Sequence, residues 1–325
     1  MAEIVSVSST SVELFDGTVY REEGLLPNTD YTRRDLVFTT TPSIGERHAR
    51  ICTTNDVHFG ETECGKFGGG PAQFWSLPGE RPYPTVMNES VVMDMAEMAP
   101  DVVVVRGDLT NAGEPEEYDE FLRLYEGAFG HHMVHVRGNH DGYTGRMFAN
   151  SPVQIVDVPG VRIVLLDTGR EFQSFGCISD DQIDATVAAA RAATTPTIVM
   201  GHHPLDVPGA DLPADGVCGE DSERFARALA PVRSIVGYTA GHTHRCKRYD
   251  FEGLPLIETA SVKDFPGVFG RYDVGTKGIS YTVHRASSPE AVIWAERTRA
   301  MFDGFYGRYA YGHLHDRSVT LPLER

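Results

Sequence analysis

The chain has 325 residues, 41% of them hydrophobic, which allows one large domain or two small ones around a sizeable core. Its formal charge of −17 repels a polyanion, so nucleic acid is not an expected partner. The N-terminus lacks a basic, apolar leader, and no apolar run reaches the length of a membrane span, so we expect a soluble, cytoplasmic protein without membrane contact. The five cysteines form no C-x-x-C pair, which predicts reduced thiols and excludes a zinc ribbon.

Residues 1–47 are predicted to form a short N-terminal β appendage. Hydrophobic alternation indicates strands at residues 5–7 and 12–14, and Asp16-Gly17 is a two-residue hairpin signal. The segment carries no recognisable motif chemistry, and it is too short for a complete fibronectin type III sandwich. Residues 48–325 are expected to form one α/β domain that includes a C-terminal extension.

From about residue 47, short apolar runs alternate with helical patterns, which indicates strands that are connected through helices. Helices are expected at residues 85–98, 115–126 and 179–192. The third of them begins with a capping box made by Ser179 and Gln182, and a hairpin is expected to turn at Pro159-Gly160. The loop at residues 61–84 is rich in Gly and Pro, and it is compatible with a lid, a substrate wall or a surface insertion.

Five apolar runs are each followed by polar side chains that bind metals well. The runs lie at residues 50–53, 102–105, 133–136, 197–200 and 235–238. The polar residues that follow them are, in the same order, Asp56 with His58, Asp108, Asn139, His202, and His242 with His244. In open α/β sheets, ligands bind beyond the carboxyl ends of the strands, so we expect these seven side chains to converge.

Carboxylate, amide and imidazole ligands without a thiolate suit Mn, Fe or Zn. Seven such residues exceed the need of one ion, whereas two ions that share a carboxylate would use all of them, as in two-metal hydrolytic sites. Each motif taken alone also has an ordinary explanation, such as a polar turn, a left-handed asparagine or a structural histidine. The ordered set is what favours a dinuclear site.

The motifs are D-x-H at 56–58, GD at 107–108, GNHD at 138–141, GHH at 201–203 and GHTH at 241–244. With this order over residues 48 to 260, the chain resembles the calcineurin-like metallophosphoesterase superfamily. The resemblance implies an α/β fold in which two mixed β-sheets pack as a sandwich flanked by helices, and two transition-metal ions, Mn or Fe ahead of Zn. It implies that one metal is held by Asp56, His58, Asp108 and His244. The other would be held by Asp108, Asn139, His202 and His242, with Asp108 as the bridge.

The stretch GDLT at 107–110 is similar to the branch that contains bacterial class III cyclic nucleotide phosphodiesterases and glycerophosphodiesterases. A purple acid phosphatase would have a tyrosine ligand at the position of Asn111, and a Ser/Thr protein phosphatase would have an arginine within residues 109–113. This chain has neither residue, so neither class is expected. The resemblance therefore implies hydrolysis of a phosphodiester by metal-bound hydroxide. A cyclic nucleotide, a glycerophosphodiester and a phosphopantetheinyl carrier protein remain open as substrates, so the partner is a small phosphorylated molecule or a carrier protein. A phosphomonoesterase and a metal-bound interaction module with negligible turnover remain as alternatives.

His140 is the predicted catalytic residue, because it follows Asn139 and could protonate the leaving oxygen or stabilise its charge. A histidine that only orients a ligand is the alternative. His203 is expected behind the ligands or in the substrate wall. The second GHxH sequence at residues 312–315 follows no apolar strand, so His313 and His315 are expected at the surface or in a helix cap.

Selectivity is expected to lie in the loops around the motifs, at residues 61–84, 170–177, 204–220 and 261–271. The aromatic stretch 302–311 is expected to cover the core rather than a partner subunit.

Overall fold

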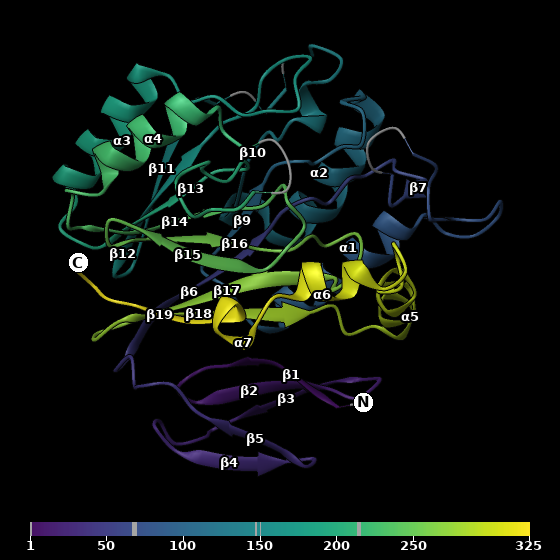
Figure 1. The fold of residues 1–325 in the computed structure, drawn as a ribbon, viewed down its shortest axis with the longest axis horizontal. Coiled ribbons are helices and arrows are strands. Elements are labelled where there is room, and N and C mark those ends of the chain that lie inside the picture. Colours follow the sequence, from purple (N-terminus) through teal and green to yellow (C-terminus); the bar gives the residue numbers. More distant parts are fainter. Residues whose placement is uncertain (1, 67–69, 147, 150, 213–215) are drawn as a thin grey trace.

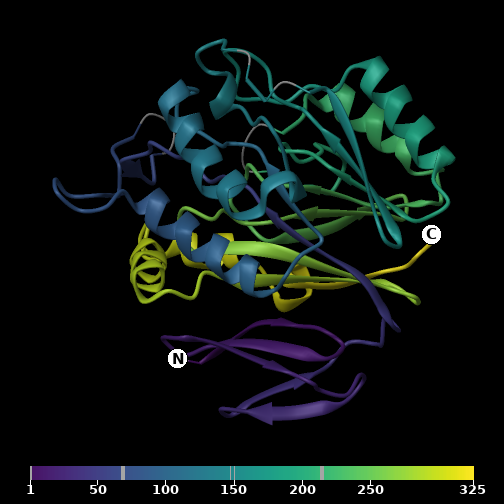
Figure 2. The same cartoon turned by 180° about the vertical axis from the view of Figure 1, so that it is seen from behind.

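The computed structural model describes residues 2–66, 70–146, 148–149, 151–212 and 216–325. Two six-stranded mixed sheets lie face to face in the centre of the molecule, and helices cover their outer faces (Figure 1, Figure 2). This arrangement confirms the predicted α/β sandwich. Within the described ranges, none of the helices is long and apolar enough to cross a membrane.

The first sheet contains the first three of the predicted motif strands. Its order is β10 (Met133–Val136), β9 (Val102–Arg106), β6 (Arg47–Thr54), β17 (Val268–Gly275), β18 (Ile279–Arg285) and β19 (Ser318–Leu321). Strands β10, β9 and β6 are parallel, whereas β17, β18 and β19 join the sheet antiparallel. Because the carboxyl ends of parallel strands meet at one edge, Asp56, Asp108 and Asn139 leave the sheet side by side.

The second sheet contains the other two motif strands. Its order is β11 (Val153–Val158), β12 (Val161–Leu166), β13 (Thr197–Met200), β14 (Ile235–Ala240), β16 (Leu254–Glu258) and β15 (Lys247–Phe251). The four inner strands are parallel, and the two edge strands are antiparallel. The β11–β12 hairpin turns at Pro159-Gly160, as predicted. Strands β13 and β14 carry His202, His242 and His244 towards the first sheet's motif loops.

Helices pack on both outer faces, and each predicted helix is present. The first sheet is covered by α1 (Tyr83–Glu97), α2 (Pro115–Phe129), α5 (Pro289–Thr298) and α6 (Phe305–Tyr311), and the second by α3 (Asp180–Ala192) and α4 (Gly219–Leu229). The short elements are β7 (Glu63–Cys64), β8 (Phe74–Trp75), η1 (Gly130–His132), η2 (His140–Gly142) and α7 (Leu314–Arg317). The capping box of Ser179 and Gln182 forms at the start of α3. All five cysteines are free.

The N-terminal strands pair only among themselves in the described structure. β1 (Glu3–Val7), β2 (Ser11–Phe15) and β3 (Val19–Glu23) form one sheet, and β4 (Asp30–Arg33) pairs with β5 (Leu36–Thr39). The β2–β3 turn contains Asp16-Gly17, as predicted. The division of the chain near residue 47 stays a prediction, because strand pairing alone does not define a domain.

Glu13 of β2 connects this sheet to the main sandwich. Its buried carboxylate accepts hydrogen bonds from Nδ1 of His284 at 2.6 Å, from the backbone N–H of Arg285 at 2.7 Å and from Nε of Arg21 at 2.7 Å. Burial alone would raise the pKa of Glu13, but His284 and Arg21 outweigh it and lower the pKa from 4.5 to about 2. Glu13 therefore contributes stability that is present above pH 4.5 and is lost as the pH falls towards 2.

We expect Glu13→Gln to lower the free energy of unfolding at neutral pH by roughly 3 kcal/mol, because it removes one of the two buried carboxylates that pair with Arg21. The deficit should shrink in acid, since protonation of Glu13 in the wild-type protein removes the same charge. Urea unfolding at neutral pH and near pH 3 measures both values. Glu22→Gln, in a more exposed pair with Arg33, is the control and should change little. A deficit that is equal at both pH values would contradict an ionic role for Glu13.

Candidate metal centre

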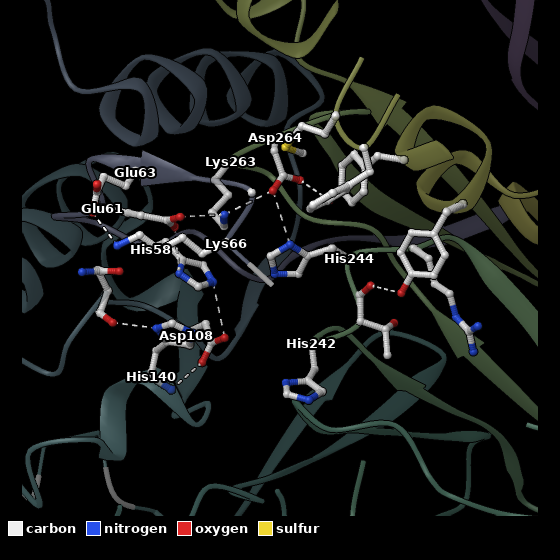
Figure 3. Close-up of a pocket in the computed structure, with 18 of the residues that line it drawn as sticks. His58, Glu61, Glu63, Lys66, Asp108, His140, His242, His244, Lys263 and Asp264 are labelled. Atoms are coloured by element: carbon white, nitrogen blue, oxygen red, sulfur yellow. Dashed lines mark hydrogen bonds and ion pairs between the residues drawn. The ribbon is translucent and has the colours of Figure 1, made fainter. Parts of the chain in front are cut away.

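The structure brings the seven predicted ligands together, and Figure 3 shows four of them. Asp108 lies in the middle: its Oδ2 is 3.4 Å from Nε2 of His58 and 3.3 Å from Nε2 of His202. On one side of it, Oδ1 of Asp56 lies 3.4 Å from Nε2 of His244. Asp108 therefore stands between two groups of potential ligand atoms.

The second group surrounds Asn139. Its side-chain oxygen is 3.2 Å from Nε2 of His202 and 3.0 Å from Nδ1 of His242. Its side-chain nitrogen donates a hydrogen bond to the hydroxyl of Tyr143 at 2.6 Å, which turns the oxygen towards the histidines. Asp108 lies near both groups, and Nε2 of His202 is also 3.9 Å from Oδ1 of Asp56, so the division of the candidate ligands between two ions stays a prediction.

The chemistry of these atoms fits a metal ion. In the described structure, Nε2 of His58 and Nε2 of His242 are buried and have no hydrogen-bond partner. Leaving a buried polar atom unpaired costs about 1–3 kcal/mol, so buried polar atoms in native proteins are normally satisfied. Imidazole nitrogens and carboxylate or amide oxygens are donors that Mn, Fe and Zn accept. A bound cation would satisfy these atoms.

The electrostatics of the site also favour a cation. Burial raises the pKa of Asp108, but His202 and His140 outweigh it and hold that pKa well below its usual range. Against burial, Asp108 in turn raises the pKa of His202 to about 9. The carboxylate of Asp108 therefore stays ionised, and it stabilises a nearby positive charge, such as that of a protonated His202 or of a bound cation.

The backbone is left-handed at several of the candidate ligands. Positive φ angles occur at Asp56 (54°), His58 (49°), Asp108 (49°), His242 (68°) and His244 (53°). Non-glycine residues are rarely left-handed, and such strained residues cluster at functional sites. Gly107, with φ of 85°, shows why the GD motif needs glycine: a Cβ there would lie 2.6 Å from the backbone nitrogen of Gly138. The glycine lets two motif loops approach each other.

His140 is held by its neighbours so that one ring nitrogen remains available. Its backbone N–H donates to Oδ1 of Asp108 at 2.9 Å, and its Nδ1 lies 2.6 Å from the carbonyl oxygen of Asn111. Because a carbonyl can only accept, Nδ1 carries the hydrogen and Nε2 is left without it in the neutral ring. His140 also lines the cavity above the centre. His203, by contrast, is buried behind the ligands, with Nδ1 2.8 Å from the hydroxyl of Thr168.

Three charged residues behind the ligands were missed as site residues from the sequence (Figure 3). Oε2 of Glu61 lies 3.1 Å from Nδ1 of His58, and Oδ2 of Asp264 lies 3.4 Å from Nδ1 of His244. Nζ of Lys263 joins the two carboxylates at 3.0 and 3.2 Å. All three are buried. They therefore connect two histidines of the same ligand group from behind, and such outer contacts orient metal ligands.

We expect Lys263→Met to weaken the binding of one metal ion by about 10- to 100-fold and to leave the other unchanged. The substitution leaves Glu61 and Asp264 as two buried carboxylates with no cation between them, which disturbs His58 and His244. Titrating chelated protein with Mn²⁺ in a calorimeter resolves the two affinities. Lys263→Arg should restore most of the loss, and the exposed Lys277→Met should have no effect. Equal weakening of both ions would contradict the selective role.

The centre opens into a cavity of about 830 Å³. Three of the four predicted selectivity loops contribute to its lining in the described structure, through Glu63, Leu212 and Lys263 among others. The prediction for residues 170–177 stays a prediction: none of them is among the described lining residues of this cavity, but Phe175 lines a smaller pocket that shares Leu212 with it. Parts of two loops, residues 67–69 and 213–215, lie outside the described ranges.

The C-terminal stretch 302–311 has two roles, of which the sequence predicted one. Tyr306 and Tyr311 are buried in the core, as expected, but Phe302, Phe305 and Tyr309 line the cavity, to which Tyr306 also contributes. The second GHxH sequence lies elsewhere, because His313 caps α7 and His315 is exposed. The GHTH at 241–244 is therefore the histidine pair at the centre.

Comparisons with known proteins identify the family of the chain. A family model described as calcineurin-like phosphoesterase matches residues 49–246. The chain is 31% identical over 176 residues to a probable cyclic nucleotide phosphodiesterase of Rhodococcus erythropolis, covering 50% of this chain and 57% of that protein. It is 27% identical over 158 residues to a glycerophosphodiester phosphodiesterase of Enterobacter lignolyticus, covering 45% and 56%.

The fold has a counterpart among solved structures. A dimetal phosphatase from Danio rerio superposes with a TM-score of 0.60 at 15% identity, covering 75% of this chain and 98% of that one. The matches to the two curated relatives cover less than two thirds of their length. The family match extends from β6 to the GHTH loop and includes every predicted ligand. The chain belongs to the calcineurin-like phosphoesterase family.

Proposed function

We propose that this protein is a two-metal hydrolase of phosphodiesters. The observation that carries the proposal is the pair of ligand groups that share Asp108, since a shared carboxylate is the usual link in two-metal hydrolytic sites. Two bound ions would lower the pKa of a water molecule and withdraw charge from the phosphoryl oxygens. The set of oxygen and nitrogen ligands favours Mn or Fe, with Zn as a third choice.

The protein's own residues would orient the substrate and handle the proton. Asp108 and Asn139 line the cavity beside His140, so a metal ion held by them would place the phosphoryl group at this end of the cavity. His140 lines the same cavity, and its Nε2, which carries no hydrogen in the neutral ring, is the atom that would pass a proton to the leaving oxygen. Asn111 holds the ring in the tautomer that leaves this nitrogen available.

The charges around the cavity support a diester over a monoester. Each of the three cations on the described cavity lining is already paired with a carboxylate: Lys66 with Glu63, Lys263 with Glu61, and Arg245 with Glu258. A monoester carries about one more negative charge than a diester, and these paired cations are poorly placed to accept it. The names of both curated relatives, a cyclic nucleotide and a glycerophosphodiester phosphodiesterase, point the same way.

The test is hydrolysis of bis-p-nitrophenyl phosphate after chelation and re-addition of Mn, Fe or Zn, alongside p-nitrophenyl phosphate. We expect activity to return with metal and to be higher on the diester. Higher activity on the monoester would instead establish a phosphomonoesterase of the same fold. If two ions bind per chain and neither substrate is hydrolysed, the interaction module is the better explanation.

A further inference from the structure

An aromatic segment outside the family match forms one side of the cavity. Phe302, Phe305 and Tyr309 line the cavity, and we refer to them as the aromatic wall. The candidate ligands His58, His242 and His244 line the same cavity. The family match ends at residue 246, so the wall comes from a part of the chain that the shared motifs do not define. The wall and the metal ligands face one continuous space.

Two tyrosine hydroxyls fix this segment against the metal centre. Tyr309 donates a hydrogen bond to the carbonyl oxygen of Thr243 at 2.6 Å, and Thr243 lies between His242 and His244. Tyr306 donates to Oδ1 of Asp264 at 2.7 Å, and the other oxygen of that carboxylate faces His244. Helix α6 is therefore attached at two points to the residues that carry or support the ligands.

The two phenylalanines of the aromatic wall are exposed to solvent, although hydrogen bonds fix helix α6 in place. Phe305 is 55% exposed and Phe302 is 37% exposed, whereas their neighbour Tyr306 is 8% exposed. The ring of Phe305 stacks on that of Tyr309, with centroids 5.8 Å apart and planes inclined by 22°. Exposed apolar rings that border a cavity are typical of ligand sites, because burial would otherwise be favourable. The open ring of Phe305 offers a flat face.

The backbone that presents these rings is unusual. Three consecutive residues are left-handed, with φ of 52° at Phe302, 55° at Asp303 and 80° at Gly304. A bulky residue such as phenylalanine rarely adopts positive φ, and such strain persists where the surrounding structure and its function require it. The strained turn places Phe302 at the cavity and starts α6 at Phe305.

We propose that the aromatic wall binds a planar aromatic group, such as a nucleobase, on the ester of the substrate. The proposal rests on the proposed phosphodiesterase function and narrows its substrate class. Bases stack well on exposed aromatic rings whatever their hydrogen-bonding pattern. A glycerol or pantetheine chain has no flat face and would gain little from the wall. The cavity of about 830 Å³ lies within the size range of sites for molecules of nucleotide size.

The test uses two ligands that differ only in the base: adenosine 5′-monophosphate and ribose 5-phosphate. Both are titrated calorimetrically into full-length protein loaded with Mn²⁺. We expect the wild-type protein to bind the adenosine compound tighter by on the order of 10- to 100-fold. The double variant Phe302→Ala, Phe305→Ala should bring the ratio close to one while binding ribose 5-phosphate as before. Phe305→Leu keeps apolar volume without a ring, and it should lose a large part of the ratio.

Phe172→Ala is the matched control. Phe172 is also exposed, at 67%, and also left-handed, with φ of 60°, but it does not line the cavity, so its loss should leave the ratio unchanged. Equal binding of both ligands by the wild-type protein would overturn the proposal, as would a double variant that keeps the ratio. A double variant that loses both ligands equally would also overturn it, because the wall would then support only the phosphate site. Failure of the proposed function is read separately, as absent metal-dependent hydrolysis by the wild-type protein.

Discussion

Asp108→Asn is expected to lower kcat/KM for bis-p-nitrophenyl phosphate by roughly 10³-fold or more, because the loss of a two-metal centre removes several kcal/mol of transition-state stabilisation. The amide is almost the same size as the carboxylate but is neutral, so it cannot hold two cations. Asp108 also accepts the backbone N–H of His140, and the amide can keep that contact. The variant should therefore fold and bind at most one ion per chain. Metal content is measured by elemental analysis after gel filtration, beside the initial rates.

Asp94→Asn separates this effect from a general loss of stability. Asp94 is a buried carboxylate that pairs with Arg21, away from the cavity. Its replacement should lower the unfolding midpoint while the metal content and kcat/KM stay near the wild-type values. If Asp108→Asn retained two ions and full activity, the shared role of Asp108 would be wrong.

His140→Ala is expected to reduce kcat by about 10²- to 10⁴-fold on a diester with an alkyl leaving group, the usual contribution of a positioned proton donor. The loss should be much smaller with p-nitrophenolate as leaving group, because this anion is stable without a proton. Metal content should stay at two ions per chain, since the ring of His140 is not in the predicted ligand set. The dependence on the leaving group is what distinguishes proton donation from a purely structural role.

The exposed His131→Ala is the control, and both substrates should be hydrolysed at the wild-type rate. An equal loss on both substrates, together with lost metal, would show that His140 only orients its neighbours. In that case the contact between the His140 ring and the carbonyl oxygen of Asn111 would be the important one. The alternative prediction from the sequence, a histidine that only orients a metal ligand, would then be correct.

The convergence of the seven candidate ligands was predictable because each of them follows a strand of one of the two sheets. Runs such as residues 102–105 and 198–200 are apolar throughout, so their ends are easy to locate, and parallel pairing brings those ends together. The capping box at Ser179 and the hairpin at Pro159-Gly160 are likewise local patterns. Local patterns of this kind specify the two sheets and the floor of the site.

The other parts of the site depend on contacts between distant segments. Glu61 and Lys263 are 202 positions apart, and nothing in either neighbourhood indicates that they meet behind His58. The same holds for Phe305. The aromatic sequence around it predicts a segment that covers the core, but it does not show which rings remain exposed to solvent. One local feature pointed to the contact between Glu61 and Lys263. Lys263 and Asp264 are two adjacent charged residues in a mainly uncharged stretch after a buried strand.

The left-handed ligands have a consequence for how such a protein can change over generations. Each left-handed non-glycine residue costs about 1–2 kcal/mol, so the five at the centre together hold on the order of 5 to 10 kcal/mol. That sum is comparable to the whole stability of an ordinary domain. Replacing these residues with glycine would relax the backbone and also remove buried charged groups. A lineage released from selection for catalysis would therefore gain stability as it lost these residues.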